Sequence, residues 1–237
     1  MFEIKKAMIL AAGYGKRMQP ITNKIPKPLV EVGGISVIKR LLDQLYNSGI
    51  EEVVINTAHL AKKIHEHLKD YKKLKIIFSD EGTPLETGGG VKKAIAHLGE
   101  KPFIVVNGDA IFHDKGPTVF DQLMKKWHPG MDILLALVPK ENSLGLATPG
   151  DYHTKEESLI ERRKEGLAPY YYGGAQILQP RLFTNHSDNH FSLLALYDKA
   201  EEKGTLYGIE YDGLWFHAGT PEDLQEINDW FAKNKGE

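Results

Sequence analysis

Cysteine is absent from this chain of 237 residues. Its absence excludes disulfide bonds, thiolate zinc sites and cysteine nucleophiles, and it leaves the redox compartment unmarked. No apolar run approaches the ~18 residues of a membrane-spanning helix, and charged residues interrupt the N-terminus MFEIKKAMIL too early for a signal peptide. We therefore expect no membrane partner and take the cytoplasm as the default location.

A block of basic residues is also missing, and the formal net charge is −2. Nucleic-acid binding depends on many phosphate contacts, so this balance argues against a nucleic-acid partner. The ten histidines do not cluster as metal ligands do, since His65 and His67 would lie on different faces of a helix. The length suffices for one large α/β domain or two small ones.

Segments typical of strands alternate with segments typical of helices as far as Val138. The expected strands are 7–12, 52–56, 74–79, 102–106 and 133–138, and the expected helices are 35–46, 60–68, 90–98 and 119–127. This alternation predicts an α/β fold with a Rossmann-like, mostly parallel central sheet flanked by helices. Ligands of such sheets bind at the carboxyl ends of the strands. The residues expected there are Gly13, Thr57, His59, Asp80, Glu81, Gly108 and Asp109.

The pattern changes after Pro139. Residues 142–154 are rich in glycine, proline and polar residues, and 158–163 and 170–178 indicate a β-ribbon. Helices are expected at 192–203 and 221–233, with short strands at 206–211 and 214–217. Because no repeat or linker interrupts the chain, we predict a single domain over residues 1–237. Within it, residues from about 142 to 178 would form a small β-rich lobe over the sheet that receives a second substrate.

One stretch, AMILAAGYGKRMQPITNKIPKPLV at residues 7–30, organises the rest of the chain. Its apolar run ends in Gly13-Tyr14-Gly15, and glycines after a strand let backbone N–H groups approach an anion. The cations that follow are Lys16, Arg17, Lys24 and Lys27. A stiff cationic loop of this kind suits a triphosphate. The dinucleotide fingerprint GxGxxG fails at Met18, and the phosphate loop GxxxxGK[ST] is absent.

A carboxylate, Asp109, follows the expected strand 102–106 in the run VVNGD. Magnesium takes oxygen ligands and accompanies triphosphates, so Asp109 is a candidate magnesium ligand. An ordinary turn aspartate is the alternative interpretation.

Two further runs combine glycine with groups that could contact ligands. The run EGTPLETGGG at residues 81–90 precedes the expected helix, and its glycines would leave backbone groups open to a base or ribose. The alternative is a plain linker. Residues 170–174, YYYGG, would form a flat wall suited to a sugar ring, or else ordinary sheet packing.

The stretch at residues 10–34 resembles the signature of sugar-phosphate nucleotidyltransferases, LAAGxGxRMxPxTxxxPKPLVxVxG. Residues 103–109 match the family's metal-binding motif FxVxNGD, and the resemblance extends from Ala7 to about Asp229. It is greatest to the uridylyltransferases that act on N-acetylmuramate 1-phosphate, which carry E-G-x-P-L-E-T-G-G-G. No hexapeptide-repeat acyltransferase segment, as fused to some relatives, is expected.

The resemblance implies a GT-A-type enzyme of class EC 2.7.7, which joins a sugar 1-phosphate to an NTP and releases an NDP-sugar and pyrophosphate. UTP and N-acetylmuramate 1-phosphate would be the substrates, within peptidoglycan recycling, and the protein would be a monomer or small homo-oligomer. A mannose- or heptose-1-phosphate guanylyltransferase and a phosphocholine cytidylyltransferase are alternatives. An alternative of another class is a catalytically weak regulatory protein that binds nucleotide sugars.

The same resemblance implies roles for single residues. Arg17 would neutralise the leaving pyrophosphate, Lys27 would grip the α-phosphate region, and Asp109 would hold Mg²⁺, with Mn²⁺ as the alternative metal. Implied nucleotide-binding residues are Leu10, Ala11, Ala12, Gly13, Gly15, Glu81, Glu86, Thr87, Gly88, Gly89 and Asn107. Implied sugar-binding residues are Gly145, Glu161, Tyr172 and Gly173.

The late family motif W-x-D-V-G-T-P is altered in this chain, where residues 215–221 read WFHAGTP. His217 stands where the family has a second metal-binding aspartate. Trp215 and His217 share one face of a strand, so His217 takes the direction of that aspartate. Three accounts stay open: His217 ligates the metal as a neutral imidazole, Asp212 reaches in from the preceding turn, or Asp109 and the nucleotide phosphates hold the metal alone.

Overall fold

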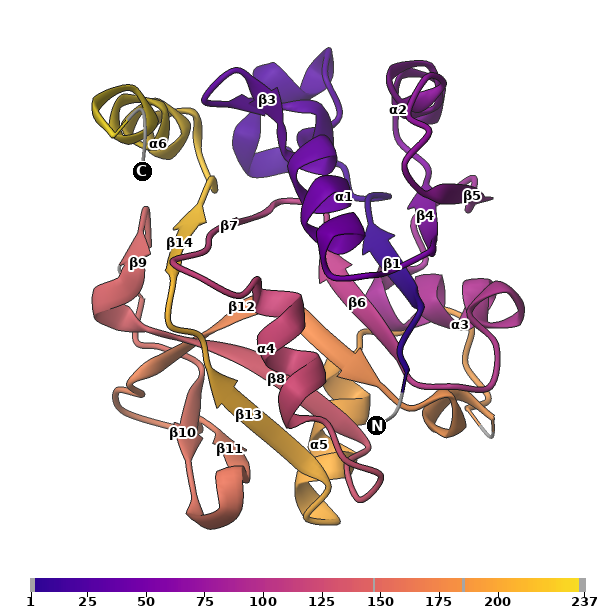
Figure 1. Ribbon diagram of the computed structural model, residues 1–237, viewed down its shortest axis with the longest axis vertical. Coiled ribbons are helices and arrows are strands. Elements are labelled where there is room, and N and C mark those ends of the chain that lie inside the picture. Colours follow the sequence, from indigo (N-terminus) through magenta and orange to yellow (C-terminus); the bar gives the residue numbers. More distant parts are fainter. Residues whose placement is uncertain (1–2, 147, 185, 235–237) are drawn as a thin grey trace.

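A nine-stranded mixed sheet forms the centre of the molecule, which a computed structural model describes for residues 3–146, 148–184 and 186–234 (Figure 1). Seven strands follow one another in the order β11-β10-β12-β6-β1-β4-β5, and β8 pairs with β12 and β13. The strands are β1 (Lys6–Leu10), β4 (Glu52–Thr57), β5 (Lys75–Asp80), β6 (Phe103–Asn107), β8 (Ile133–Pro139), β10 (Tyr152–Thr154), β11 (Ile160–Arg162), β12 (Tyr170–Leu178) and β13 (Leu206–Glu210).

Two smaller sheets lie outside this one. A three-stranded sheet has the order β7-β14-β9, with β7 (Ala110–His113), β14 (Leu214–His217) and β9 (Ser143–Leu144). A hairpin is made of β2 (Glu31–Val32) and β3 (Ile35–Ser36). Sequence patterning did not predict β7, β9 or the hairpin, whose strands have only two to four residues each.

The described residues contain six α-helices: α1 (Val37–Asn47), α2 (Ala61–Leu68), α3 (Glu86–Leu98), α4 (Val119–Lys126), α5 (Leu194–Glu202) and α6 (Pro221–Lys233). Short 3₁₀ turns lie at Lys16–Met18, Ile21–Asn23, Lys27–Leu29, Lys140–Asn142, Glu156–Ser158 and Pro180–Phe183. Among the described residues, no helix has both the length and the apolar character needed to cross a membrane.

Helices cover both faces of the sheet, because successive strand residues point to opposite sides. On β1, Ala7 and Ile9 join the layer with α1, α2 and α4, whereas Met8 joins the layer with α3 and α5. Figure 1 shows α1 and α4 in front of the sheet and α5 behind it. The Rossmann-like α/β fold predicted from the alternation is confirmed.

The central sheet contains both parallel and antiparallel strand pairs. Parallel pairs join β5, β4, β1 and β6, and β8 to β13, whereas β12 runs antiparallel to both β6 and β8. The lobe expected over residues 142–178 is therefore only partly separate, since β12 is a central strand. All residues of β12 from Gly173 to Leu178 are buried, and they join this part of the lobe to the main sheet.

Helix α3 begins at Glu86 and not at Gly90, so the prediction of a glycine run before the helix was wrong. Gly88, Gly89 and Gly90 are buried within the helix. Glycine has a low helix propensity, but packing requires it here. A Cβ on Gly88 would lie 2.3 Å from the Phe191 ring, so only glycine lets the helix pack against that ring. The Gly88 and Gly89 N–H groups donate to the Phe191 carbonyl at 2.9 and 3.0 Å.

The C-terminal helix α6 packs against the β2–β3 hairpin near the start of the chain, as Figure 1 shows. The Gly33 N–H donates to Asn228 Oδ1 at 2.9 Å, across 195 positions of sequence. The Arg40 guanidinium lies 4.8 Å from the centre of the Phe231 ring. Thr220 and Asp223 form a capping box that fixes the beginning of α6.

Candidate active site

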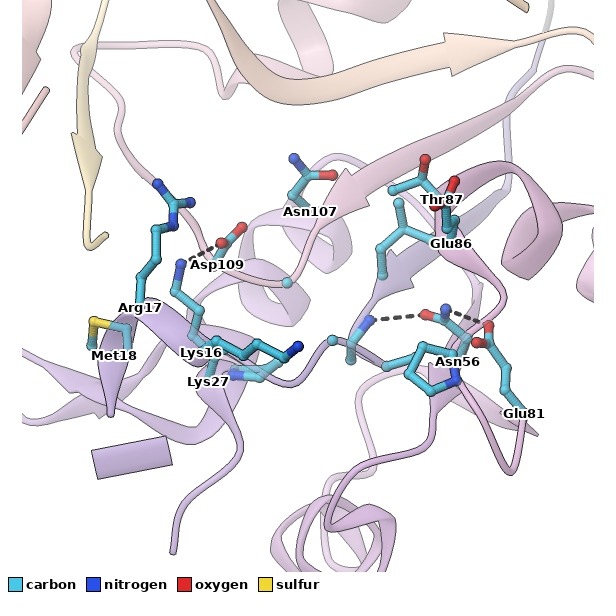
Figure 2. Close-up of a pocket in the computed structure, with 18 residues that line it drawn as sticks. Lys16, Arg17, Met18, Lys27, Asn56, Glu81, Glu86, Thr87, Asn107 and Asp109 are labelled. Carbon is cyan, nitrogen blue, oxygen red and sulfur yellow. Dashed lines mark hydrogen bonds and ion pairs between the residues drawn. The ribbon is translucent and has the colours of Figure 1, made fainter. Parts of the chain in front are cut away.

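A cavity of about 430 Å³ opens where the first strands end (Figure 2). It lies between the loop after β1, the carboxyl ends of β4, β5 and β6, and the first turn of α3. The residues that line it are Leu10, Ala11, Ala12, Gly13, Gly15, Lys16, Arg17, Met18, Lys27, Pro28, Asn56, Glu81, Pro84, Glu86, Thr87, Asn107, Gly108 and Asp109. The expected position of the site, at the carboxyl edge of the parallel strands, agrees with this cavity.

The loop after β1 keeps its shape through local contacts. Gly15 has φ +62°, a left-handed conformation that glycine adopts without strain. The Thr22 hydroxyl donates to the Gly15 carbonyl at 2.8 Å, and a Cβ on Gly15 would lie 2.8 Å from the Thr22 methyl group. The Lys63 ammonium donates to the Lys24 carbonyl at 2.6 Å, which ties the loop to α2.

The ends of β1 and β6 approach closely at Gly108. Its N–H donates to the Leu10 carbonyl at 2.8 Å, and a Cβ at this position would lie 2.6 Å from the same oxygen. Only glycine fits there. This contact sets the spacing between the glycine loop and Asp109.

Lys27 and Asp109 form an ion pair at 2.5 Å in the cavity wall, drawn as a dashed line in Figure 2. The Lys27 side chain is 13% exposed and that of Asp109 35%. Burial alone would raise the pKa of Asp109, but the Lys27 ammonium outweighs it and holds the pKa below its usual value. Asp109 is therefore ionised at neutral pH, and the pair is electrically neutral before any ligand binds.

Two further cations, Lys16 and Arg17, lie beside this pair and are exposed. Figure 2 shows the Arg17 guanidinium next to Asp109 and Lys27. Since the Lys27–Asp109 pair is neutral, Lys16 and Arg17 give this end of the cavity a net positive charge. Such a surface attracts phosphate groups.

The opposite end of the cavity is organised by Asn56, which sequence patterning did not identify. Asn56 Oδ1 accepts the Ala11 N–H at 2.8 Å, and Asn56 Nδ2 donates to Glu81 Oε1 at 2.7 Å. Glu81 Oε2 in turn accepts the Leu85 N–H at 2.8 Å. The network joins the ends of β1, β4 and β5. A buried amide at the end of an apolar strand was the available signal.

His217 lies next to the ion pair in the fold, because β14 pairs with β7 and sets His217 opposite Ala110. Burial lowers the pKa of His217, and the Lys27 ammonium lowers it further, so the imidazole is neutral at pH 7. Its buried Nε2 has no hydrogen-bond partner among the described residues. A free, neutral imidazole nitrogen is suited to bind a metal ion or a donor group.

Asp212 lies at the other end of β14. Leu214 pairs with His113, at the end of the strand pair remote from Ala110, and Asp212 accepts a hydrogen bond from Gln122 Nε2 at 2.7 Å. The account in which Asp212 reaches the metal site is therefore wrong.

A divalent metal would find few protein donors here. Across residues 3–146, 148–184 and 186–234, no three His, Asp or Glu side chains gather in a metal-binding arrangement. Magnesium commonly uses one or two carboxylates and takes its other ligands from substrate phosphates and water. The ionised Asp109 and the unpartnered Nε2 of His217 fit such a donor set.

Most of the residues that we expected to bind the nucleotide are part of the cavity lining, but Gly88 and Gly89 are not. The four predicted sugar-binding residues also lie outside its lining. Gly145 packs on the His217 carbonyl and Gly173 on Val138. Tyr172 lies against Tyr197, with ring centres 6.0 Å apart. Glu161 lies on the edge strand β11 and pairs with Lys155 at 2.5 Å. Sugar binding by these four residues stays a prediction.

The family described as "Nucleotidyl transferase" matches residues 6–234 of the chain. An N-acetylmuramate alpha-1-phosphate uridylyltransferase of Caulobacter vibrioides is 39% identical over 92% of this chain and 93% of its own length. A mannose-1-phosphate guanyltransferase of Saccharomyces cerevisiae is 31% identical over 92% of this chain and 62% of its own. A UDP-glucose pyrophosphorylase solved with UDP-glucose has the same fold, with a TM-score of 0.81 at 18% identity over 98% and 100% of the two chains.

Proposed function

The chain belongs to the nucleotidyl transferase family and is a sugar-phosphate nucleotidyltransferase, and on this basis we propose that it joins UTP to N-acetylmuramate 1-phosphate. The products would be the UDP-sugar and pyrophosphate, and the reaction would serve peptidoglycan recycling. The sequence identity of 39% to the Caulobacter uridylyltransferase, over nearly the full length of both chains, is the observation that carries this choice of substrates.

The charge distribution of the cavity supports the transfer chemistry. A phosphate oxygen of the sugar 1-phosphate attacks the α-phosphorus of the nucleotide and forms a new P–O bond, while the bond to the β-phosphate breaks and pyrophosphate leaves with its electron pair. No proton transfer by the protein is needed, because the attacking oxygen is already ionised. Positioning and charge neutralisation supply the catalysis.

The basic side chains have distinct positions for this step. Arg17 and Lys16 carry the net positive charge at their end of the cavity and would neutralise the β- and γ-phosphates. Lys27, held at Asp109 in the free protein, would contact the α-phosphate once the nucleotide enters. Removing one such donor costs roughly 10²–10³ in rate in comparable sites.

Enzymes of this family generally use a divalent metal ion. We propose that Asp109 holds it, with His217 as a second ligand, and that it is Mg²⁺ or Mn²⁺. When bound, such an ion neutralises phosphate charge and fixes the orientation of the phosphates.

The test measures pyrophosphate release by the purified protein against ATP, CTP, GTP and UTP, each with N-acetylmuramate 1-phosphate, mannose 1-phosphate and glucose 1-phosphate. The highest kcat/KM is expected for UTP with N-acetylmuramate 1-phosphate. Tight nucleotide binding without turnover for any pair would contradict the proposal and favour a regulatory protein.

A guanylyltransferase acting on mannose 1-phosphate is the second candidate, favoured by the similarity to the yeast enzyme. This chain spans only 62% of that enzyme's length, which makes it the weaker candidate. A higher kcat/KM for GTP with mannose 1-phosphate in the same panel would establish it.

A further inference from the structure

Glu86 has an unusual backbone conformation, with φ +62°, at the edge of the cavity. This left-handed region crowds the Cβ of L-residues and favours glycine, so a glutamate there is disfavoured by the backbone itself. Side chains held in such conformations often serve a ligand. The backbone conformation assigns no role to Glu86 by itself; the surroundings of its carboxylate decide what it can bind.

The two carboxylates at this end of the cavity differ in what they contact. Both oxygens of Glu81 are occupied, one by Asn56 Nδ2 and the other by the Leu85 N–H. The Glu86 carboxylate is exposed, and Figure 2 draws no hydrogen bond or ion pair from it to another residue lining the cavity. Glu86 is therefore the carboxylate with open acceptor positions.

The position of Glu86 restricts what it can bind. Figure 2 shows Glu86 and Thr87 at the opposite end of the cavity from Arg17 and Lys27. A carboxylate with no cation beside it repels phosphate, so the phosphates belong at the Arg17 end. The open oxygens of the Glu86 carboxylate accept hydrogen bonds, and in a nucleotide or a sugar phosphate two adjacent hydroxyl groups match them.

We infer that Glu86 recognises a pair of adjacent hydroxyl groups, on the ribose of the nucleotide or on the sugar ring. This inference rests on the proposed nucleotidyl transfer and adds a residue that selects the substrate. Hydrogen bonds to a charged acceptor are worth roughly 10- to 100-fold in affinity, so loss of the carboxylate would be measurable.

The experiment compares wild type with Glu86→Gln, which keeps the shape and removes the charge, and Glu86→Gly, which also relieves the backbone. Glu157→Gly is the matched control, because Glu157 is likewise an exposed glutamate with positive φ, 56°, and lies outside the cavity lining. Each variant is assayed with UTP, 2′-deoxy-UTP and 3′-deoxy-UTP, and with N-acetylmuramate 1-phosphate varied at saturating UTP. Binding of UTP alone is measured by calorimetry, and thermal unfolding reports stability.

If the hydroxyls are those of ribose, wild type prefers UTP over a deoxynucleotide by about 10- to 100-fold, and both Glu86 variants lose this preference. If they belong to the sugar, the KM for the sugar phosphate rises by a similar factor and UTP binding is unchanged. Glu157→Gly behaves as wild type, and Glu86→Gly is no less stable than wild type. An active wild type with unchanged constants in both Glu86 variants would overturn the inference, as would a change confined to the preference between UTP and GTP. Inactivity of wild type itself would contradict the proposed function instead.

Discussion

Gly90, in the first turns of helix α3, lies directly against the hydrogen-bond network at the end of β4. A Cβ on Gly90 would lie 2.6 Å from Glu81 Oε1 and 2.8 Å from Asn56 Nδ2, both closer than a real contact. In Gly90→Ala these side chains must move, and the bond of 2.7 Å between them is lost or lengthened. Because Asn56 also accepts the Ala11 N–H, the displacement reaches the glycine loop.

The expected size follows from opposing contributions. Alanine in a helix interior gains about 1 kcal/mol over glycine. Overpacking costs about 1–3 kcal/mol, and a weakened hydrogen bond to a charged group about 1.5–3 kcal/mol. We expect a net loss of about 1.5–5 kcal/mol in the free energy of unfolding, and a fall of roughly tenfold in kcat/KM because Glu81 and Ala11 line the cavity.

Urea unfolding and steady-state kinetics measure the two effects, with Gly116→Ala as control because a Cβ there meets nothing within 4 Å. A double-mutant cycle with Glu81→Ala isolates the contact, since the truncated side chain leaves room for the new methyl group. Gly90→Ala should cost much less in that background. A stability equal to wild type, or a cycle with no coupling, would refute the reasoning.

Further predictions concern the charges. Arg17→Ala and Lys27→Ala should each lower kcat roughly 100-fold or more without unfolding the protein, whereas Lys24→Ala, outside the cavity lining, should not; rates within threefold of wild type would contradict the roles of both residues. Burial, aided by the nearby Lys39, lowers the pKa of His67, so the unfolded state binds the proton more readily. The urea midpoint should therefore fall as the pH drops below about 6.5, and His67→Gln should show a smaller fall. For the metal, the ratio of Mn²⁺ to Mg²⁺ affinity, followed by calorimetry at fixed nucleotide, should be higher in wild type than in His217→Asp, because imidazole prefers transition metals. Equal ratios would remove His217 from the metal site.

Residues with a clear period were the most predictable. In α1, Val37, Ile38, Leu41, Leu42 and Leu45 repeat at helical spacing, and all five are buried. The buried strand β12 was placed at its observed bounds, Tyr170–Leu178, but its partners were not foreseen. Pairing depends on residues distant in sequence, and a strand that is buried on both faces fits many neighbours.

The predictions that missed features of the site failed for the same reason, because those features depend on contacts that the local sequence does not show. The glycines at 88–90 lowered helix propensity, and the neighbours that require Gly88 and Gly89, the ring of Phe191 and the carbonyl of Asn189, lie about a hundred positions away. Asn56 looked like the polar end of a strand, since nothing local indicated its bonds to Ala11 and Glu81. Lys27 and Asp109 were identified individually, and only the fold shows that they neutralise each other.

The contact between α6 and the β2–β3 hairpin has a consequence for synthesis of the protein. The hairpin follows directly on the cationic loop, yet Asn228, which binds the Gly33 N–H, is translated 195 residues later. His217 and the capping box of α6 are likewise translated more than a hundred residues after Asp109. A nascent chain can therefore assemble β1, β4, β5 and β6, whose ends line the cavity, before His217 on β14 reaches its place beside Lys27 and Asp109. Nucleotide bound before that point would meet the cavity lining, which lies entirely within residues 10–109, but would lack the imidazole of His217.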